Sequence, residues 1–197
     1  LDENSASMAF DCLLQSTKDG DWDVRNFAIQ GLGRLLDYGS KLSAGQLDAV
    51  FQYLMQRVND NGLHIRKLAL EKLVQLVILD SRLFSGRLDT VLKCFLGVEK
   101  DLDSLKKAAI EGLVKLLGHC PRLSNEQLRM GFRWLLEQIE DAHVDVRRST
   151  IEALVKLFEN GFVPQEQLSA VSECLLEGTK DVNQQVKQAA IEGLAKW

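Results

Sequence analysis

The chain repeats one helical pattern five times at a nearly constant spacing. Each copy begins with an aliphatic residue that is followed by at least two polar positions, and successive starts lie 41, 40, 41 and 40 residues apart. Within a copy, apolar residues recur at positions i, i+4, i+5, i+8 and i+11, which form one face of an α-helix. A regular period of this length is typical of repeat architectures. The five starting residues are Val24, Ile65, Leu105, Val146 and Val186.

A second apolar pattern with helical spacing precedes each copy, so the repeating unit is predicted to be a hairpin of two unlike helices, A and then B. Ser43 and Ser124 stand before A helices with Gln three residues later, which is the capping-box pattern. One hairpin cannot bury its apolar face alone, whereas stacked neighbours share a continuous core. The pattern therefore predicts an all-α fold built from stacked hairpins.

The turn between the two helices carries an Asp four or five residues before the aliphatic start of the B helix. Together with the Arg or Lys that follows the aliphatic start, this pattern resembles the HEAT repeat, and the resemblance extends over nearly the whole chain. In the HEAT family these acidic and basic residues form a ladder between adjacent repeats. The resemblance implies a ladder made of Asp19, Asp60, Asp101, Asp141, Asp181, Arg25, Arg66, Lys106, Arg147 and Lys187.

The resemblance and the period together predict a right-handed α-solenoid of about five HEAT-type helical hairpins. We expect residues 1–197 to form a single solenoid, with repeats at approximately 1–38, 39–79, 80–119, 120–160 and 161–197. Because the first residue is not Met and the last lies within a helical pattern, we also expect the sequence to be part of a longer protein.

Charge and hydropathy narrow the class of partner. The net charge of −4 and the pI near 5.5 disfavour nucleic acid, whose phosphates are bound by clustered Lys and Arg. No apolar run approaches the 18 residues of a membrane helix, and no signal peptide is visible. We expect an intracellular protein, in the cytoplasm or the nucleus, that binds another protein, does not insert into membranes and is monomeric.

The sequence offers no pattern for catalysis, metal binding or cofactor binding. The same A-helix position is occupied by a cysteine in every second repeat, at Cys12, Cys94 and Cys174. Helix packing places these cysteines about 20 Å from one another, whereas a disulfide requires Cα atoms within about 7 Å. We interpret the cysteines as small apolar fillers, and the three histidines lie in different repeats. A solenoid enzyme, such as a DNA glycosylase, needs a buried catalytic carboxylate, and Glu99 is the one acidic residue at a predicted interior position. We therefore predict no catalytic residue, no metal, no cofactor and no enzymatic activity.

Charged residues recur on one face of the B helices. In HEAT proteins the B helices line the concave surface, so the resemblance implies a ridge of acidic and basic rows inside the curve. As a surface for a protein partner, this ridge would make the chain a scaffold or adaptor module of a larger assembly. The alternative is that Glu and Lys pairs at i, i+4 only stabilise an exposed helix, by about 0.2–0.5 kcal/mol each. The ridge residues are Lys67, Glu71, Lys107, Glu111, Lys115, Arg148, Glu152 and Lys156.

Trp22 supplies a second hypothesis. It lies in the first A–B turn, and tubulin-binding TOG domains, which are also built from HEAT repeats, carry a Trp in a similar turn. The turns of this chain are acidic, however, and an acidic partner such as tubulin is expected to meet basic turns. The other interpretation is that Trp22 caps the exposed end of the first repeat.

Overall fold

The computed structural model describes residues 3–37, 42–81, 83–100, 103–120 and 123–196. These residues form α-helices that are joined by turns and short 3-10 segments, and none of them belongs to a β-strand. The chain divides into two compact units, residues 1–84 and residues 85–197. None of the helices in the described ranges has both the length and the apolar character that a membrane span requires.

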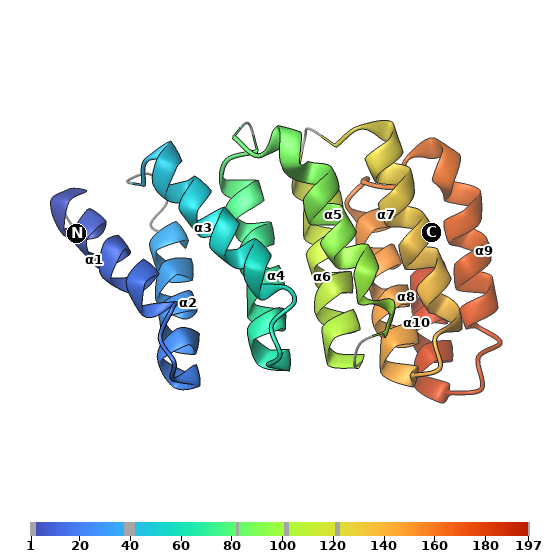
Figure 1. The fold of residues 1–197 in the computed structure, drawn as a ribbon. Coiled ribbons are helices and arrows are strands. Elements are labelled where there is room, and N and C mark those ends of the chain that lie inside the picture. The colour runs from blue at the N-terminus through green and yellow to red at the C-terminus, as the bar shows by residue number, and fades with distance from the viewer. Residues whose placement is uncertain (1–2, 38–41, 82, 101–102, 121–122, 197) are drawn as a thin grey trace. The chain divides into compact units, whose positions relative to one another are not determined.

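The first unit contains two hairpins. Helices α1 (Glu3–Ser16) and α2 (Trp22–Asp37) form the first, and α3 (Ala44–Arg57) and α4 (Leu63–Leu79) form the second. The two B helices, α2 and α4, pack side by side (Figure 1). The capping box at the start of α3 is present, since Ser43 and Gln46 exchange hydrogen bonds between side chain and backbone.

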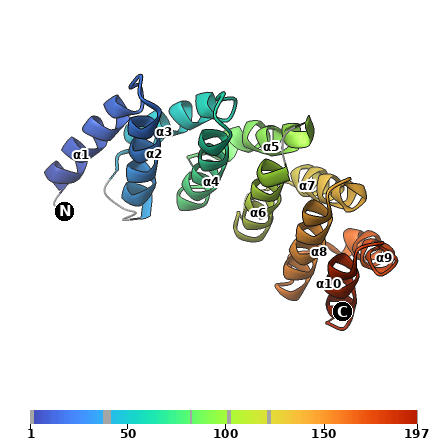
Figure 2. The same cartoon turned by 90° about the horizontal axis from the view of Figure 1, so that it is seen from below.

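The second unit contains three hairpins in two layers. The B helices α6, α8 and α10 form one layer, and the A helices α5, α7 and α9 form the other (Figure 2). A capping box at Ser124 begins α7, as predicted. Short 3-10 segments extend the A helices at Ser85–Arg87, Gly97–Lys100, Gln138–Glu140 and Gln165–Gln167. The helix bounds are α5 Leu88–Leu96, α6 Asp103–His119, α7 Asn125–Glu137, α8 Val144–Glu159, α9 Leu168–Gly178 and α10 Gln184–Leu194.

The repeated apolar positions form the core of each unit. At position i+8 of the B helices, Leu32, Leu73, Leu113 and Leu154 are buried. Each of these side chains is at most 2% exposed, so the packed helices of its own unit enclose it. The predicted all-α solenoid of helical hairpins is therefore confirmed. Whether the two units continue as one solenoid over residues 1–197 stays a prediction.

Candidate functional site

The A–B turns are closed by their Asp residues. In each described turn, one carboxylate oxygen of the Asp accepts a hydrogen bond from the backbone N–H two residues later, at 2.7–2.9 Å. Such a bond fixes the turn in a conformation that leads into the B helix. The residues are Asp19, Asp60, Asp141 and Asp181. Asp101 lies outside the described residues.

Two rungs of the expected ladder join consecutive hairpins of the second unit. The Lys106 ammonium group on α6 lies 2.5 Å from the free carboxylate oxygen of Asp141. Arg147 on α8 donates two hydrogen bonds to the Asp181 carboxylate, at 2.6 and 3.0 Å. Arg147 also donates to the backbone carbonyl oxygens of Asp141 and Ala142, so it holds its own turn as well as the next one.

Both carboxyl groups titrate below their ordinary range. Burial would raise the pKa of Asp141, but hydrogen bonds from Lys106 and from the His143 backbone outweigh burial and lower it. The hydrogen bond from Arg147 is the main cause of the lowered pKa of Asp181, and Lys187 adds a smaller contribution. The same bond raises the pKa of the Arg147 guanidinium. Both carboxyl groups are therefore ionised at neutral pH.

The first unit has a different arrangement. Arg25 donates to the carbonyl oxygens of Asp19 and Gly20 in its own turn, both at 2.8 Å. Asp60 pairs instead with Arg57, three residues earlier, at 3.0 Å. The expected rung between Arg25 and Asp60 is therefore not formed, because a basic residue on the preceding A helix occupies the carboxylate.

A groove of about 350 Å³ runs between α6 and α8 on the face that carries the ridge. Its floor is apolar and its rims carry exposed charges, so it has the features of a binding surface. It brings together four of the eight ridge residues from two consecutive repeats. The lining residues are Ile110, Glu111, Val114, Lys115, Ser149, Glu152, Ala153 and Lys156.

The charges around this groove do not neutralise one another as the sequence suggested. Glu152 pairs with Arg148 at 3.6 Å, one turn earlier on α8. The ammonium groups of Lys115 and Lys156 form no ion pair with any residue that the structure describes, so the Glu111–Lys115 and Glu152–Lys156 pairs expected from their i, i+4 spacing are absent. These two lysines are therefore available to an external acidic group.

The other ridge residues lie outside the groove. Lys67 and Glu71 form a loose pair on α4 in the first unit, with 3.9 Å between the charged atoms. Lys107 lies on α6 one turn before Glu111, and both Lys107 and Arg148 are partly exposed. Their positions continue the charged rows on the same helices, although they do not line the groove.

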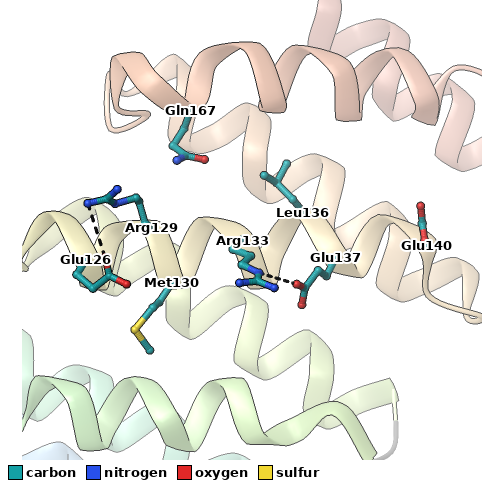
Figure 3. Close-up of a pocket in the computed structure, with 8 residues that line it drawn as sticks. All are labelled: Glu126, Arg129, Met130, Arg133, Leu136, Glu137, Glu140 and Gln167. Atoms are coloured by element: carbon teal, nitrogen blue, oxygen red, sulfur yellow. Dashed lines mark hydrogen bonds and ion pairs between the residues drawn. The ribbon is translucent and has the colours of Figure 1, made fainter.

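A larger groove of about 620 Å³ lies along α7 in the A layer (Figure 3). Four of its five charged lining residues pair within the helix: Glu126 lies 3.6 Å from Arg129, and Arg133 lies 3.1 Å from Glu137. The fifth, Glu140, lies in the 3-10 segment after α7 and has no ion pair among the described residues. These i, i+3 and i, i+4 pairs can be read from the sequence, but the groove cannot, because it depends on how far α7 lies from the segment around Gln167. Both basic groups of this groove are paired, so it offers less to an acidic partner than the groove between α6 and α8 does.

Trp22 contacts the second A–B turn. Its ring lies 5.9 Å from the ring of His64, measured between centroids, and its indole nitrogen lies against Gly62. The side chain is 42% exposed. These contacts join the start of α2 to the second turn. The interpretation of Trp22 as a cap of the exposed end of the first repeat and the tubulin-binding alternative both stay predictions.

Cysteine environments differ along the chain. Cys120 and Cys174 are buried, and burial raises the pKa of the Cys174 thiol to about 12, so this thiol is inert at neutral pH. Cys12 is exposed, so its interpretation as an apolar filler was wrong. Within the described ranges, no group of three or more His, Cys, Asp or Glu residues is arranged to hold a metal ion. The side chain of Glu99 lies outside the described residues.

Comparisons with known proteins agree with this geometry. The fold defines an α-solenoid of helical hairpins, and the HEAT repeat family model matches residues 9–39, a segment that includes most of the first hairpin. The resemblance to HEAT repeats is therefore confirmed. A search of curated proteins found no match.

Several solved structures share the fold. A crystal structure of an engineered protein is 16% identical, with a TM-score of 0.63, and the match covers 95% of this chain and 78% of that one. Computationally designed armadillo repeat proteins for modular peptide recognition are 15% identical, with a TM-score of 0.57, over 94% of this chain and 80% of theirs. A crystal structure of a second engineered protein is 15% identical, with a TM-score of 0.61, and the match covers 95% of this chain and 47% of that one.

Proposed function

We propose that the chain is a non-catalytic protein-binding module, a scaffold or adaptor within a larger intracellular assembly. We further propose that it binds its partner along the B-helix ridge, and that the groove between α6 and α8 holds an extended acidic segment of that partner. The observation that carries the proposal is the pair of lysines, Lys115 and Lys156, which flank one groove from two repeats without an ionic partner among the described residues.

Charge supports an acidic occupant. Glu152 is paired with Arg148, so the unpaired charges at the groove itself are Lys115, Lys156 and Glu111. With Lys107 nearby, basic groups outnumber acidic ones on this face, although the chain as a whole carries a net charge of −4. Charge complementarity of this kind sets partner choice and association rate more than it sets affinity.

Helix spacing supports an extended occupant. Packed helices lie about 8–10 Å apart, and an extended chain advances about 3.3 Å per residue. Acidic side chains two residues apart point to the same side of an extended peptide and can therefore reach the lysines of two consecutive repeats. The apolar floor, which includes Ile110 and Val114, can hold a small apolar side chain between them.

One of the similar solved structures is named for modular peptide recognition. At 15% identity that likeness concerns the fold and carries no residue role to this chain. It supports the proposal in one respect: a stack of helical hairpins is a suitable scaffold for an extended peptide.

The test is a fluorescence anisotropy titration with a labelled twelve-residue peptide of alternating Glu and Ser, and with its Lys and Ser counterpart. The wild-type chain is expected to bind the acidic peptide, and more weakly as salt rises. The double variant Lys115→Glu with Lys156→Glu is expected to lose affinity by at least about tenfold, because like charges then face the peptide.

The matched control is Arg129→Glu with Arg133→Glu, which makes the same charge change on α7 in the A-layer groove. It is expected to keep the wild-type affinity apart from a small long-range loss. Equal losses in the two double variants, or preference for the basic peptide, would contradict the proposed site.

A further inference from the structure

Among the described residues, three pairs of neighbouring B helices pack within a single unit: α2 with α4 in the first unit, and α6 with α8 and α8 with α10 in the second. At each of these junctions, position i+9 of one B helix meets position i+7 of the next. The residues that meet are Gly33 and Lys72, Val114 and Ala153, and Val155 and Gly193. The pairs differ in size and charge, so the three junctions offer a partner different amounts of space.

Lys72 closes the junction between α2 and α4. Its side chain lies across the backbone of Gly33, since a Cβ at position 33 would stand 2.7 Å from both the Cδ and the Nζ atoms of Lys72. The Lys72 ammonium group donates a hydrogen bond to the side-chain oxygen of Gln75 at 3.1 Å, and the Gln75 amide donates to the Gly33 carbonyl oxygen at 3.1 Å. The side chains of α4 therefore fill the space between these two helices.

Direct packing closes the junction between α8 and α10. Gly193 of α10 lies against Val155 of α8, which is 8% exposed and belongs to a core cluster of the second unit. The basic residue at position i+10 of α10, Lys196, pairs with Glu159 of α8 at 3.1 Å. This junction therefore has a filled floor, and the lysine on its α10 side is already occupied.

The junction between α6 and α8 has neither feature. Val114 and Ala153, which are 8% and 6% exposed, form the floor of the groove together with Ile110. The methyl group of Ala153 is too short to cross to the neighbouring helix in the way that the stem of Lys72 does. The groove of about 350 Å³ is therefore the space that a longer side chain at position 153 would fill.

We infer that the residue at position i+7 decides which of these junctions admits the acidic segment of the partner. Ala153 leaves the junction between α6 and α8 open, whereas Lys72 closes the junction between α2 and α4. This inference rests on the function proposed above and adds a specificity-determining position to it. The lysines select the charge of the segment, and position i+7 selects the place at which the segment is held.

The first unit already carries part of a second site. At position i+10, where α6 and α8 have Lys115 and Lys156, α2 has Arg34 and α4 has Gln75. Arg34 is exposed and forms no ion pair within the part of the chain that the structure describes. Removing the stem of Lys72 and supplying a second cation is therefore expected to build a groove with the same two features, an open floor and a basic group on each rim.

The test is isothermal titration calorimetry with a six-residue peptide of alternating Glu and Ser, which is about 20 Å long when extended. The wild-type chain is expected to bind it, and Lys72→Ala with Gln75→Lys is expected to bind one peptide more per chain. The two single variants are the matched controls. Lys72→Ala lacks the second cation and Gln75→Lys keeps the closed floor, so each is expected to bind as many peptides as the wild type. Hydrogen–deuterium exchange of the double variant is expected to show added protection on α2 and α4.

A further variant closes the natural groove without changing its charge. Ala153→Met places an unbranched, uncharged side chain on the floor, and the affinity is expected to fall by at least about tenfold, because this side chain and the peptide compete for one space. Ala44→Met makes the same change at an exposed position of α3 and is expected to keep the wild-type affinity. Circular dichroism checks that every variant is folded.

The outcomes separate this inference from the proposed function. Wild-type affinity in Ala153→Met, or no additional peptide in Lys72→Ala with Gln75→Lys, would overturn the role of position i+7. So would an additional peptide in Gln75→Lys alone, because charge alone would then decide where the segment binds. A wild-type chain that binds no acidic peptide would overturn the proposed function itself, and this inference with it.

Discussion

The rung between Arg147 and Asp181 gives the sharpest test of how the hairpins of the second unit are held together. Replacing Arg147 with Met keeps the unbranched stem and removes the guanidinium. The change deletes two hydrogen bonds to the Asp181 carboxylate and two to the carbonyl oxygens of Asp141 and Ala142. It also leaves Asp181 as a largely buried carboxylate without its main partner.

The expected loss of stability follows from the burial of this pair. The side chains of Arg147 and Asp181 are 12% and 11% exposed, so solvent screens the pair much less than it screens a surface pair. Removing one partner of a buried pair costs about 3–5 kcal/mol, and the remaining exposure and the Lys187 charge nearby reduce that value. We expect a loss of about 2–3 kcal/mol in the free energy of unfolding.

The assay is urea denaturation of the whole chain, followed by circular dichroism. Arg133→Met is the matched control, because Arg133 is exposed and pairs with Glu137 within α7 at 3.1 Å. An exposed pair of this kind contributes about 0.3–0.5 kcal/mol. If Arg147→Met lost no more stability than Arg133→Met, the ladder would be a surface feature and the reasoning about burial would be refuted.

Three further predictions concern the core and the turns. Leu113→Ala removes a buried side chain and is expected to cost about 2–5 kcal/mol in urea melts, and a neutral result would refute the core assignment. Gly193→Ala would place a methyl group 2.4 Å from a methyl group of Val155. The crowding costs about 1–3 kcal/mol, which outweighs the gain of about 1 kcal/mol in helix propensity. A lower melting temperature is therefore expected, and a higher one would contradict the packing of α10 against α8. The pKa values of Asp141 and Asp181 are lowered in the folded chain. The contribution of these two carboxylates to the free energy of unfolding is therefore fully present above the pKa of an unfolded Asp, about 3.9, and is lost as the pH falls through their folded-state pKa values. Between pH 6 and pH 2 the melting temperature of Asp181→Asn is expected to fall less than that of the wild type. Equal dependence of the two melting temperatures on pH would contradict a lowered pKa for Asp181.

Much of the fold could be predicted because its determinants are local or periodic. The capping boxes at Ser43 and Ser124 depend on residues three apart, and the Asp of each described turn bonds to the backbone two residues later. The apolar columns of the B helices follow from the period of an α-helix, so the hairpins could be aligned without a structure.

Contacts that depend on competition between side chains could not be predicted in the same way. Asp60 has two basic candidates, and Arg57 forms the ion pair because it lies in the same hairpin. Likewise Glu152 lies one turn from both Arg148 and Lys156, and it pairs with Arg148. Sequence spacing permits both choices, whereas the rotamers decide between them.

The groove between α6 and α8 depends on a longer-range feature. Its width is set by helix packing. The periodicity of the sequence does not give this width, so the groove is where the structure adds most to the sequence.

The central claim is that the groove between α6 and α8 binds an acidic segment. The most direct measurement is hydrogen–deuterium exchange of the chain with and without the labelled Glu and Ser peptide. The account predicts slower exchange in the parts of α6 and α8 that carry Lys115 and Lys156, and no change in these parts for Lys115→Glu with Lys156→Glu. Protection along α7, or in the A–B turns around Trp22, with none at α6 and α8 would contradict it.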